Sequence, residues 1–215
     1  MKTLICPSLM CADQLRLFDE IKSLISAGAD MLHIDVMDGE FVPNIQIGTG
    51  TVRAIKREFD IPLDLHLMIN APHRKLDYFP IEKGDCVSVH YETTPHPARA
   101  AEYIRKKGGK ALLALNPATP LSVCENVISC FDGVLIMTVN PGYSGQKLIP
   151  ETLCKIKRIK ELLPAGYLIE ADGNVSFESA GTMVKNGANM LVSGSSSVFS
   201  REFDYKTSIE RLKNL

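Results

Sequence analysis

Short apolar runs rich in Ile, Val and Leu recur along the chain about every 25 residues, and amphipathic stretches separate them. Such runs are typical of buried strands, and the stretches between them are typical of helices. The runs predict eight strands, near Thr3–Ser8, Met31–Val36, Leu63–Met68, Cys86–His90, Ala111–Leu115, Gly133–Thr138, Tyr167–Ala171 and Met190–Ser193. The amphipathic stretches predict helices such as Asp13–Ala27, Thr51–Glu58, Pro97–Lys107, Pro150–Leu162 and Phe177–Asn186.

This alternation of strands and helices predicts an α/β fold with a parallel sheet, and eight strands are the number that closes into a (β/α)8 TIM barrel. A doubly wound open sheet is the competing fold. Glycines near helix ends predict left-handed caps, at Gly28, Gly84, Gly109 and Gly187. Because no linker-like segment divides the chain, we expect residues 1–215 to form a single catalytic domain.

The composition adds few constraints. A formal net charge of −1 gives no reason to expect nucleic acid or an anionic membrane as partner. No apolar run approaches the roughly 20 residues of a membrane span, and Pro7 and Asp13 argue against a secretory signal at the N-terminus. The six cysteines lack CxxC spacing, which favours reduced thiols over disulfides or a zinc knuckle. We therefore expect a cytoplasmic protein.

Polar residues cluster where the predicted strands end, which is the end that carries the active site in such barrels. Alternation along a strand places His33 and Asp35 on one face, and His66 and Asp172 occupy matching positions on two other strands. Two imidazoles and two carboxylates can bind one divalent ion, with zinc, ferrous iron, cobalt and manganese all compatible. The alternative is that these groups only hydrogen-bond to each other inside the barrel.

The two carboxylates also suggest a reaction. A base can remove a C–H proton beside a carbonyl if a Lewis acid holds the resulting charge. Inverting the stereocentre requires a second group on the opposite face. Asp35 and Asp172 lie on well-separated strands and could supply one face each.

Three small-residue loops predict a phosphate site. A Gly-rich loop runs from Met137 to Gln146, Gly173–Asn174 follows the seventh strand, and Gly194–Ser197 follows the eighth. Small residues expose backbone N–H groups, and the last loops of such barrels commonly bind phosphate. The first loop is also long enough to act as a lid. Three methionines near the mouth either fill the core or cover a reactive intermediate.

Taken together, the strings PSLMCAD, LHIDVMDGEFVPN, LDLHLM, MTVNPGYSGQ, EADGN and SGSSSVF resemble the motifs of the ribulose-phosphate 3-epimerase family, in family order over nearly the whole chain. The resemblance implies a metal-dependent isomerase that inverts C3 of a ketose phosphate and forms a homo-oligomer. It implies metal ligands at His33, Asp35, His66 and Asp172, with Asp35 and Asp172 as acid and base. The residues expected to bind substrate are Ser8, Met37, Met68, Met137, Gly142, Tyr143, Ser144, Gly145, Gly173, Asn174, Gly194, Ser195 and Ser196.

Some motif details differ from the pentulose-phosphate pattern. Leu9–Cys11, Asn174 and the longer loop from Gly194 to Phe199 are similar to D-allulose-6-phosphate 3-epimerases. A rearranged phosphate loop suits a longer sugar, so these details favour D-allulose 6-phosphate and D-fructose 6-phosphate as substrates. The alternative pair is D-ribulose 5-phosphate and D-xylulose 5-phosphate.

Two more distant functions fit the sequence less well. A decarboxylase or aldol-type lyase needs a catalytic lysine, and the strand ends carry none. A sugar-phosphate sensor would not need four ligands. His90, at the end of the fourth strand, either touches substrate or has a packing role.

Overall fold

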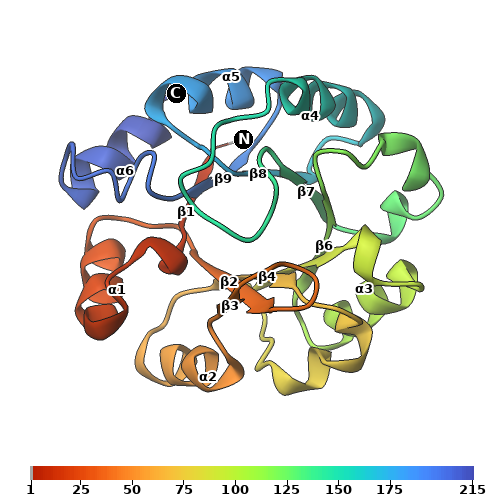
Figure 1. Cartoon of the computed structure of the whole chain (residues 1–215), viewed down its shortest axis with the longest axis horizontal. Helices are drawn as coiled ribbons and strands as arrows, with labels where there is room; N and C mark the ends of the chain where they lie inside the picture. The colour runs from red at the N-terminus through yellow and green to blue at the C-terminus, as the bar shows by residue number, and fades with distance from the viewer. Residues whose placement is uncertain (1) are drawn as a thin grey trace.

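Eight parallel strands form a closed ring in the computed structural model, which describes residues 2–215 (Figure 1). The strands are β1 (Leu4–Pro7), β2 (Leu32–Asp38), β4 (Leu63–Met68), β5 (Cys86–His90), β6 (Lys110–Leu115), β7 (Gly133–Met137), β8 (Leu168–Asp172) and β9 (Met190–Ser193). Consecutive strands pair in parallel from β2 round to β9, which pairs with β1. A bridge between Ser8 and His33 closes the ring and excludes the open-sheet alternative. The predicted (β/α)8 barrel is confirmed.

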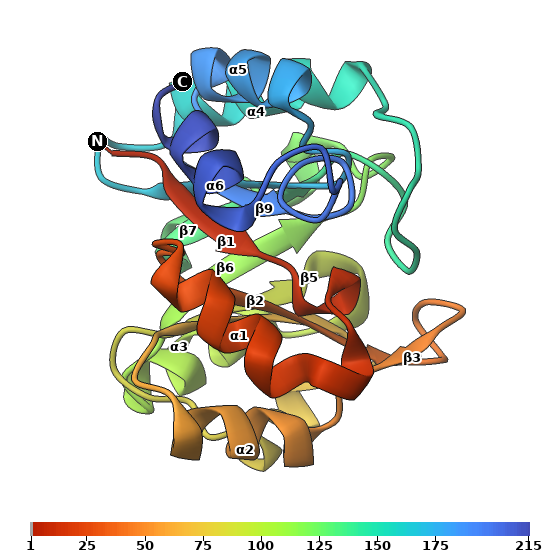
Figure 2. The ribbon, with the colours of Figure 1, turned by 90° about the vertical axis from the view of Figure 1, so that its left-hand side faces the viewer.

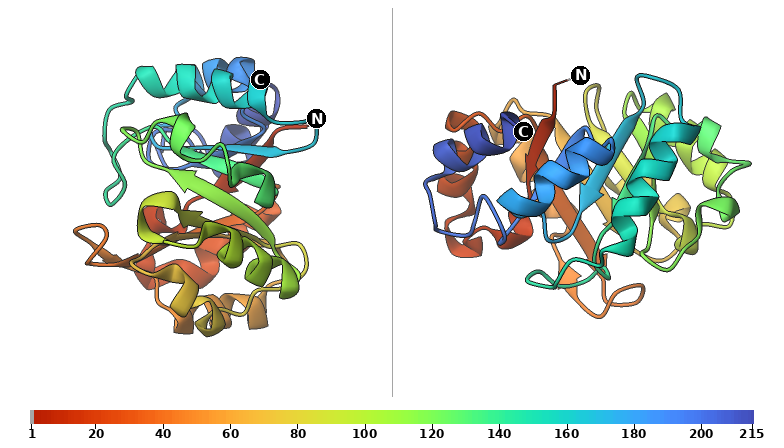
Figure 3. Two further views of the ribbon diagram at one scale, coloured as in Figure 1. Left: turned by 90° about the vertical axis from the view of Figure 1, so that its right-hand side faces the viewer. Right: turned by 90° about the horizontal axis from the view of Figure 1, so that it is seen from above.

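The helices lie outside the ring (Figures 2 and 3). They are α1 (Leu17–Ser26), α2 (Thr49–Glu58), α3 (Pro97–Lys106), α4 (Glu151–Leu162), α5 (Phe177–Asn186) and α6 (Tyr205–Lys213). Two connections carry only short 3-10 turns within the described residues, Pro72–Arg74 and Leu76–Tyr78 after β4, and Leu121–Val123 and Ile128–Cys130 after β6. None of the helices in residues 2–215 is long and apolar enough to span a membrane.

Because side chains alternate along each strand, those on the outer face pack in one core and those on the inner face in another. Outward-facing residues such as Ile34, Leu65 and Val134 are fully buried in the large layer between sheet and helices. At the base of the barrel interior, a smaller apolar cluster fills the ring with Cys6, Met31, Cys86, Leu112, Leu168 and Met190. The base is therefore closed by apolar packing, and polar groups lie above it.

The pattern located every strand of the ring to within two residues, and it missed two elements. Helix α6 was not predicted, although Asp204 caps it by accepting a hydrogen bond from the Thr207 N–H. The short strand β3 (Ile45–Gln46), which pairs antiparallel with the end of β2, was missed as well. The helix expected from Asp13 begins as an α-helix only at Leu17, because Gln14–Arg16 forms a 3-10 turn.

Three of the four glycines expected in left-handed conformation adopt it: Gly28, Gly84 and Gly187. The prediction for Gly109 was wrong, because its neighbour Gly108 takes the positive φ of 98° after α3. Gly109 is instead required by space, since a Cβ atom there would lie 2.7 Å from Ile81 Cγ2. All six cysteines are free thiols, as expected.

Candidate functional site

The four predicted metal ligands meet at the mouth of the barrel. His33 and Asp35 lie on β2, His66 on β4 and Asp172 at the end of β8. One side-chain atom from each of the four lies within 4.8 Å of the others. Asp35 Oδ1 is 3.3 Å from His33 Nε2 and 3.5 Å from His66 Nδ1, and Asp172 Oδ2 is 3.3 Å from His66 Nδ1. These donors converge on one point.

The chemistry of these donors fits a divalent cation. His33 Nε2 and His66 Nδ1 are buried and have no hydrogen-bond partner. An unpartnered buried nitrogen costs free energy, and a metal ion would use both lone pairs. Two imidazoles with two carboxylates form a donor set compatible with several first-row divalent metals. The site could therefore hold one metal ion.

A second acidic group lies just beneath this site. His33, Asp64 and Glu170 also bring potential ligand atoms together. Asp64 Oδ2 is 2.5 Å from His33 Nδ1, the ring nitrogen that faces away from the other ligands. A carboxylate in this position fixes the tautomer and orientation of a metal-binding histidine. Asp64 precedes His66 by two residues on β4 and so shares its inward face, but the sequence alone does not show this contact.

The buried charges influence one another strongly. Burial alone would raise the pKa of Asp35, but the adjacent imidazoles of His33 and His66 outweigh burial and hold that pKa well below its usual range. Burial would lower the pKa of His33, yet Asp35 and Asp64 raise it well above the ordinary value. Glu170 is different, because burial and the nearby Asp64 carboxylate raise its pKa. Asp35 is therefore an ionised carboxylate, whereas Glu170 is stabilised in its neutral form.

His90 contacts a metal-ligand candidate. Its Nε2 is 2.8 Å from His66 Nε2, and its Nδ1 is 3.2 Å from Glu92 Oε2. Burial lowers the pKa of His90 to about 4, so its ring is neutral at neutral pH. Burial would raise the pKa of Glu92, but hydrogen bonds from His90, Thr119 and Asn116 lower it to about 2. Of the two roles considered for His90, this geometry favours a packed, hydrogen-bonded one.

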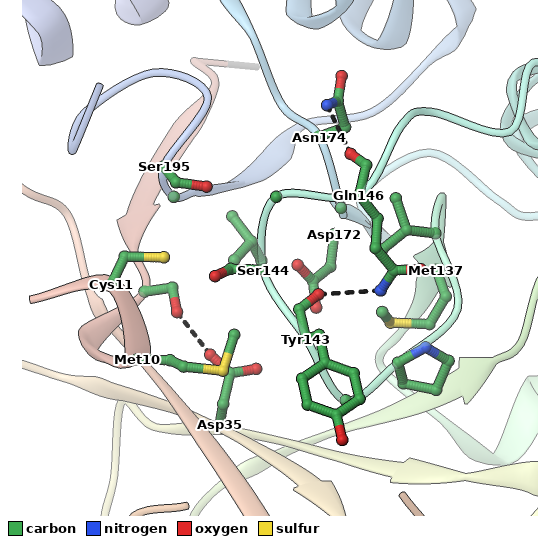
Figure 4. Close-up of a pocket in the computed structure, with 18 of the residues that line it drawn as sticks. Met10, Cys11, Asp35, Met137, Tyr143, Ser144, Gln146, Asp172, Asn174 and Ser195 are labelled. Atoms are coloured by element: carbon green, nitrogen blue, oxygen red, sulfur yellow. Dashed lines mark hydrogen bonds between the residues drawn. The ribbon is translucent and has the colours of Figure 1, made fainter. Parts of the chain in front are cut away.

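A pocket opens at two of the four ligand residues, Asp35 and Asp172 (Figure 4). Asp35 and Asp172 line it from different strands. Every residue expected to bind substrate also lines it: Ser8, Met37, Met68, Met137, Gly142, Tyr143, Ser144, Gly145, Gly173, Asn174, Gly194, Ser195 and Ser196. The pocket is also lined by residues that the sequence did not single out for substrate binding: Met10, Cys11, Val139, Asn140, Pro141, Gln146, Val175 and Val192. The first six lie inside the motif strings, and Val175 and Val192 directly adjoin them.

Ser8 reaches the metal-ligand group directly. Its hydroxyl donates to Asp35 Oδ2 at 2.5 Å, which leaves Asp35 Oδ1 to face the two imidazoles. The two oxygens of Asp35 therefore have separate neighbours. The three methionines are almost fully buried, and Met37 and Met68 pack with Val42 on one side of the pocket.

The three small-residue loops contact one another around the pocket. The Asn174 side chain donates to the Gln146 carbonyl at 2.7 Å and lies 3.4 Å from Ser196 Oγ, so it links all three loops. Gly173 has φ of 114°, and a Cβ atom there would lie 2.6 Å from a Val139 methyl group. Only glycine permits both this conformation and this close approach.

The loop after β7 extends over the mouth of the barrel (Figure 1) and projects from the same end as the β3 region (Figure 2). Asn44 Nδ2 donates to the Gly142 carbonyl at 2.9 Å. The Tyr143 hydroxyl donates to the Pro43 carbonyl. These contacts fasten the loop to the opposite side of the mouth, as a lid over the pocket.

Comparisons with known proteins agree with this geometry. Residues 4–199 match the sequence profile of the Ribulose-phosphate 3 epimerase family. The Bacillus subtilis ribulose-phosphate 3-epimerase is 47% identical over 195 residues, covering 89% of this chain and 90% of that protein. The chloroplastic ribulose-5-phosphate-3-epimerase of Arabidopsis thaliana is 41% identical over 215 residues, covering 98% of this chain and 76% of that protein.

Solved structures of other enzymes share the fold. The tryptophan synthase α-subunit of Pyrococcus furiosus aligns with a TM-score of 0.67 at 16% identity, over 100% of both chains. Orotidine 5'-phosphate decarboxylase from Pyrococcus horikoshii aligns with a TM-score of 0.64 at 15% identity, over 98% of both chains. At these identities the likeness establishes the barrel fold alone.

Proposed function

The chain belongs to the ribulose-phosphate 3-epimerase family and is a ketose-phosphate 3-epimerase, and from that premise we propose that it interconverts D-ribulose 5-phosphate and D-xylulose 5-phosphate. The observation that carries the proposal is the convergence of Asp35 and Asp172 with one unpartnered nitrogen from each of His33 and His66. The two aspartates line a pocket that three Gly-rich or Ser-rich loops also line.

We propose that His33, Asp35, His66 and Asp172 hold one divalent metal ion. The orphaned nitrogens of the two histidines and the ionised Asp35 support this set. When bound, the ion supplies Lewis-acid stabilisation of negative charge on the substrate oxygens. Zinc, ferrous iron, cobalt and manganese all suit these donors.

Asp35 and Asp172 divide the proton transfer between them. One aspartate, as the carboxylate, removes the C3 proton from one face of the sugar, and the other, as the carboxylic acid, gives its proton to the opposite face. Ser8 holds one oxygen of Asp35 by a hydrogen bond and so fixes the direction in which the carboxylate points. The buried methionines Met37, Met68 and Met137 exclude water from the planar enediolate between the two steps.

The three loops bind the phosphate group. Gly142–Gly145, Gly173–Asn174 and Gly194–Ser196 line the same pocket and expose backbone N–H groups or hydroxyls. The loop after β7 completes the enclosure as a lid, and the hydrogen bonds from Asn44 to Gly142 and from Tyr143 to Pro43 hold it to the far side of the mouth.

The relatives favour the pentulose phosphate over the hexulose phosphate suggested by the loop details. The Bacillus subtilis and Arabidopsis thaliana proteins, at 47% and 41% identity, are both ribulose-phosphate epimerases by name. The Asn174 contacts offer another explanation for this part of the loop details. Asn174 ties the loops together through Gln146 and Ser196, a structural role that requires no longer sugar.

The test is a comparison of two substrates. Metal-reconstituted enzyme is given D-ribulose 5-phosphate and, separately, D-allulose 6-phosphate, and proton NMR follows the appearance of each C3 epimer. We expect a higher kcat/KM for the pentulose phosphate. A higher value for the hexulose phosphate would reverse the substrate assignment, and no turnover of either with any divalent metal would contradict the proposed function.

We propose that residues 1–215 act as one catalytic domain and that the cytoplasmic enzyme is a homo-oligomer. Light scattering of the purified protein measures the assembly directly, and a monomeric mass would contradict the second part.

A further inference from the structure

We infer that Glu92 is a positioning residue for the metal-binding nitrogen of His66 and that it acts through His90. The inference rests on the metal site proposed above. It concerns a carboxylate on the far side of His90 from that site, outside the set of residues that line the pocket.

The three side chains form a continuous line. His66 Nδ1 faces Asp172 Oδ2 at 3.3 Å, and its other nitrogen lies 2.8 Å from His90 Nε2. His90 Nδ1 in turn lies 3.2 Å from Glu92 Oε2. Both imidazoles are fully buried, and the Glu92 side chain is 22% exposed. Water therefore has little access to either histidine.

Proton counting gives this line a direction. His66 can offer a lone pair at Nδ1 only if its proton is on Nε2, and that proton must be donated to His90 Nε2. His90 then carries its own proton on Nδ1 and donates it to Glu92. A carboxylate accepts and cannot donate, so Glu92 selects this arrangement. The reverse arrangement would place a proton on His66 Nδ1, where it would oppose a cation.

The orientation of Glu92 is itself fixed by donors. Its Oε1 accepts from the Asn116 N–H at 2.9 Å and from the Thr119 hydroxyl. Lys155, on α4, donates to the carbonyls of Asn116 and Thr119 at 2.8 and 2.7 Å, which holds that loop in place. Both partners of Oε1 are therefore donors, and Oε2 remains available for His90.

His33, the other histidine of the proposed metal site, contacts its carboxylate without an intervening residue. Asp64 contacts His33 Nδ1 directly, whereas Glu92 reaches His66 across one intervening imidazole. Both histidines thus have a carboxylate that sets their tautomer, one adjacent and one relayed. Partners of this kind typically affect metal affinity by about 10- to 100-fold.

The test uses Glu92→Gln, with Glu125→Gln at an exposed position as the matched control. The glutamine amide must direct its NH2 group either at the Asn116 N–H or at His90, and the second choice favours the reverse tautomer. Two-dimensional 15N NMR of histidine-labelled, metal-free protein reports the tautomer of His90, which lies between His66 and Glu92. We expect the His90 proton on Nδ1 in wild type and in Glu125→Gln, and a mixture of the two tautomers in Glu92→Gln.

Metal affinity gives a second readout, measured by competition of Zn²⁺ with a chromophoric chelator. We expect Glu92→Gln to bind about tenfold more weakly than wild type. In a His90→Phe background, which breaks the line, Glu92→Gln should change the affinity no further. An unchanged His90 tautomer and unchanged affinity in Glu92→Gln would overturn the inference, as would an equal loss in the His90→Phe background.

These readouts separate the inference from the proposed function. The tautomer is measured without metal or substrate, so a shift in Glu92→Gln supports the relay whatever sugar the enzyme uses. If wild type turns over no ketose phosphate while the shift is present, the proposed function fails and the relay stands. If wild type is an active epimerase and no shift occurs, the relay alone fails.

Discussion

The base and the mouth of the barrel interior are built from the same strands and have opposite character. On β8, the inward residues run from Leu168 at the base to Asp172 at the mouth. The base is filled by thioether, thiol and aliphatic groups that need no partners, whereas the mouth holds charged and unpartnered groups. The difference indicates that the base contributes stability and the mouth contributes chemistry, at the cost of buried polar atoms that have no hydrogen-bond partner.

The largest effect should come from a change at the mouth. Asp172→Asn removes one of the two proposed proton carriers and one metal ligand while keeping the side chain's size. We expect kcat/KM to fall about 10³-fold or more, even at saturating metal. Binding of inorganic phosphate, measured by calorimetry, should largely survive because the loops are untouched. The exposed Asp19→Asn is the control, and full turnover by Asp172→Asn would refute the role of Asp172 as acid/base.

A change at the base should have the opposite signature. Leu112→Ala leaves a cavity in the apolar cluster at the bottom of the ring, where Leu112 is fully buried. We expect about 3 kcal/mol less stability to urea unfolding, with kcat/KM per folded molecule unchanged. Leu15→Ala, at a leucine that is 97% exposed, should be nearly neutral. If Leu112→Ala lost activity without losing stability, the division between base and mouth would be wrong.

Asp64 lies between the base and the mouth of the barrel interior, so a variant there tests where one region ends and the other begins. Asp64→Asn keeps an oxygen near His33 Nδ1 but removes the charge that fixes its tautomer. We expect metal affinity to weaken about tenfold, which chelator competition measures. The solvent-exposed Asp60→Asn serves as the control. Equal affinities would show that Asp64 belongs functionally with the base.

The smallest effect should come from the lid. Tyr143→Phe removes the hydroxyl that donates to the Pro43 carbonyl and leaves the ring in place. One neutral hydrogen bond contributes about 1 kcal/mol, so we expect KM to rise about fivefold with kcat nearly constant. Steady-state kinetics on D-ribulose 5-phosphate distinguish this from a fall in kcat alone, which would argue against a fastening role.

The sequence was most informative where a pattern repeats. The recurring apolar runs located the strands of the ring. Alternation of side chains along a strand grouped His33 with Asp35 and put His66 on an inward face, and the structure places all three side chains together. Contacts between distant loops had no such signal. The pairing of Asn174 with Gln146 and Ser196 depends on how three loops pack, and the sequence does not show it. Without that contact, the sequence offers only substrate specificity as an explanation for the loop differences.

Other misses have local causes. The pattern could not choose between Gly108 and Gly109, because adjacent glycines are equally able to end a helix. Helix α6 did carry a signal, an Asp204 cap followed by amphipathic residues. The relay through His90 could not be predicted, since it depends on which nitrogen of each ring faces which neighbour.

The central claim is that two carboxylates act on opposite faces of C3, and deuterium tracing in the wild-type enzyme tests it most directly. The enzyme converts a small fraction of D-ribulose 5-phosphate in D2O, and proton NMR reads C3 of the product and of the recovered substrate. With two carriers, the proton removed by one aspartate is not the one returned by the other. We therefore predict that the product carries deuterium at C3 and that the recovered substrate keeps its hydrogen. Product that retains the substrate's own C3 hydrogen would indicate a single base and contradict the account.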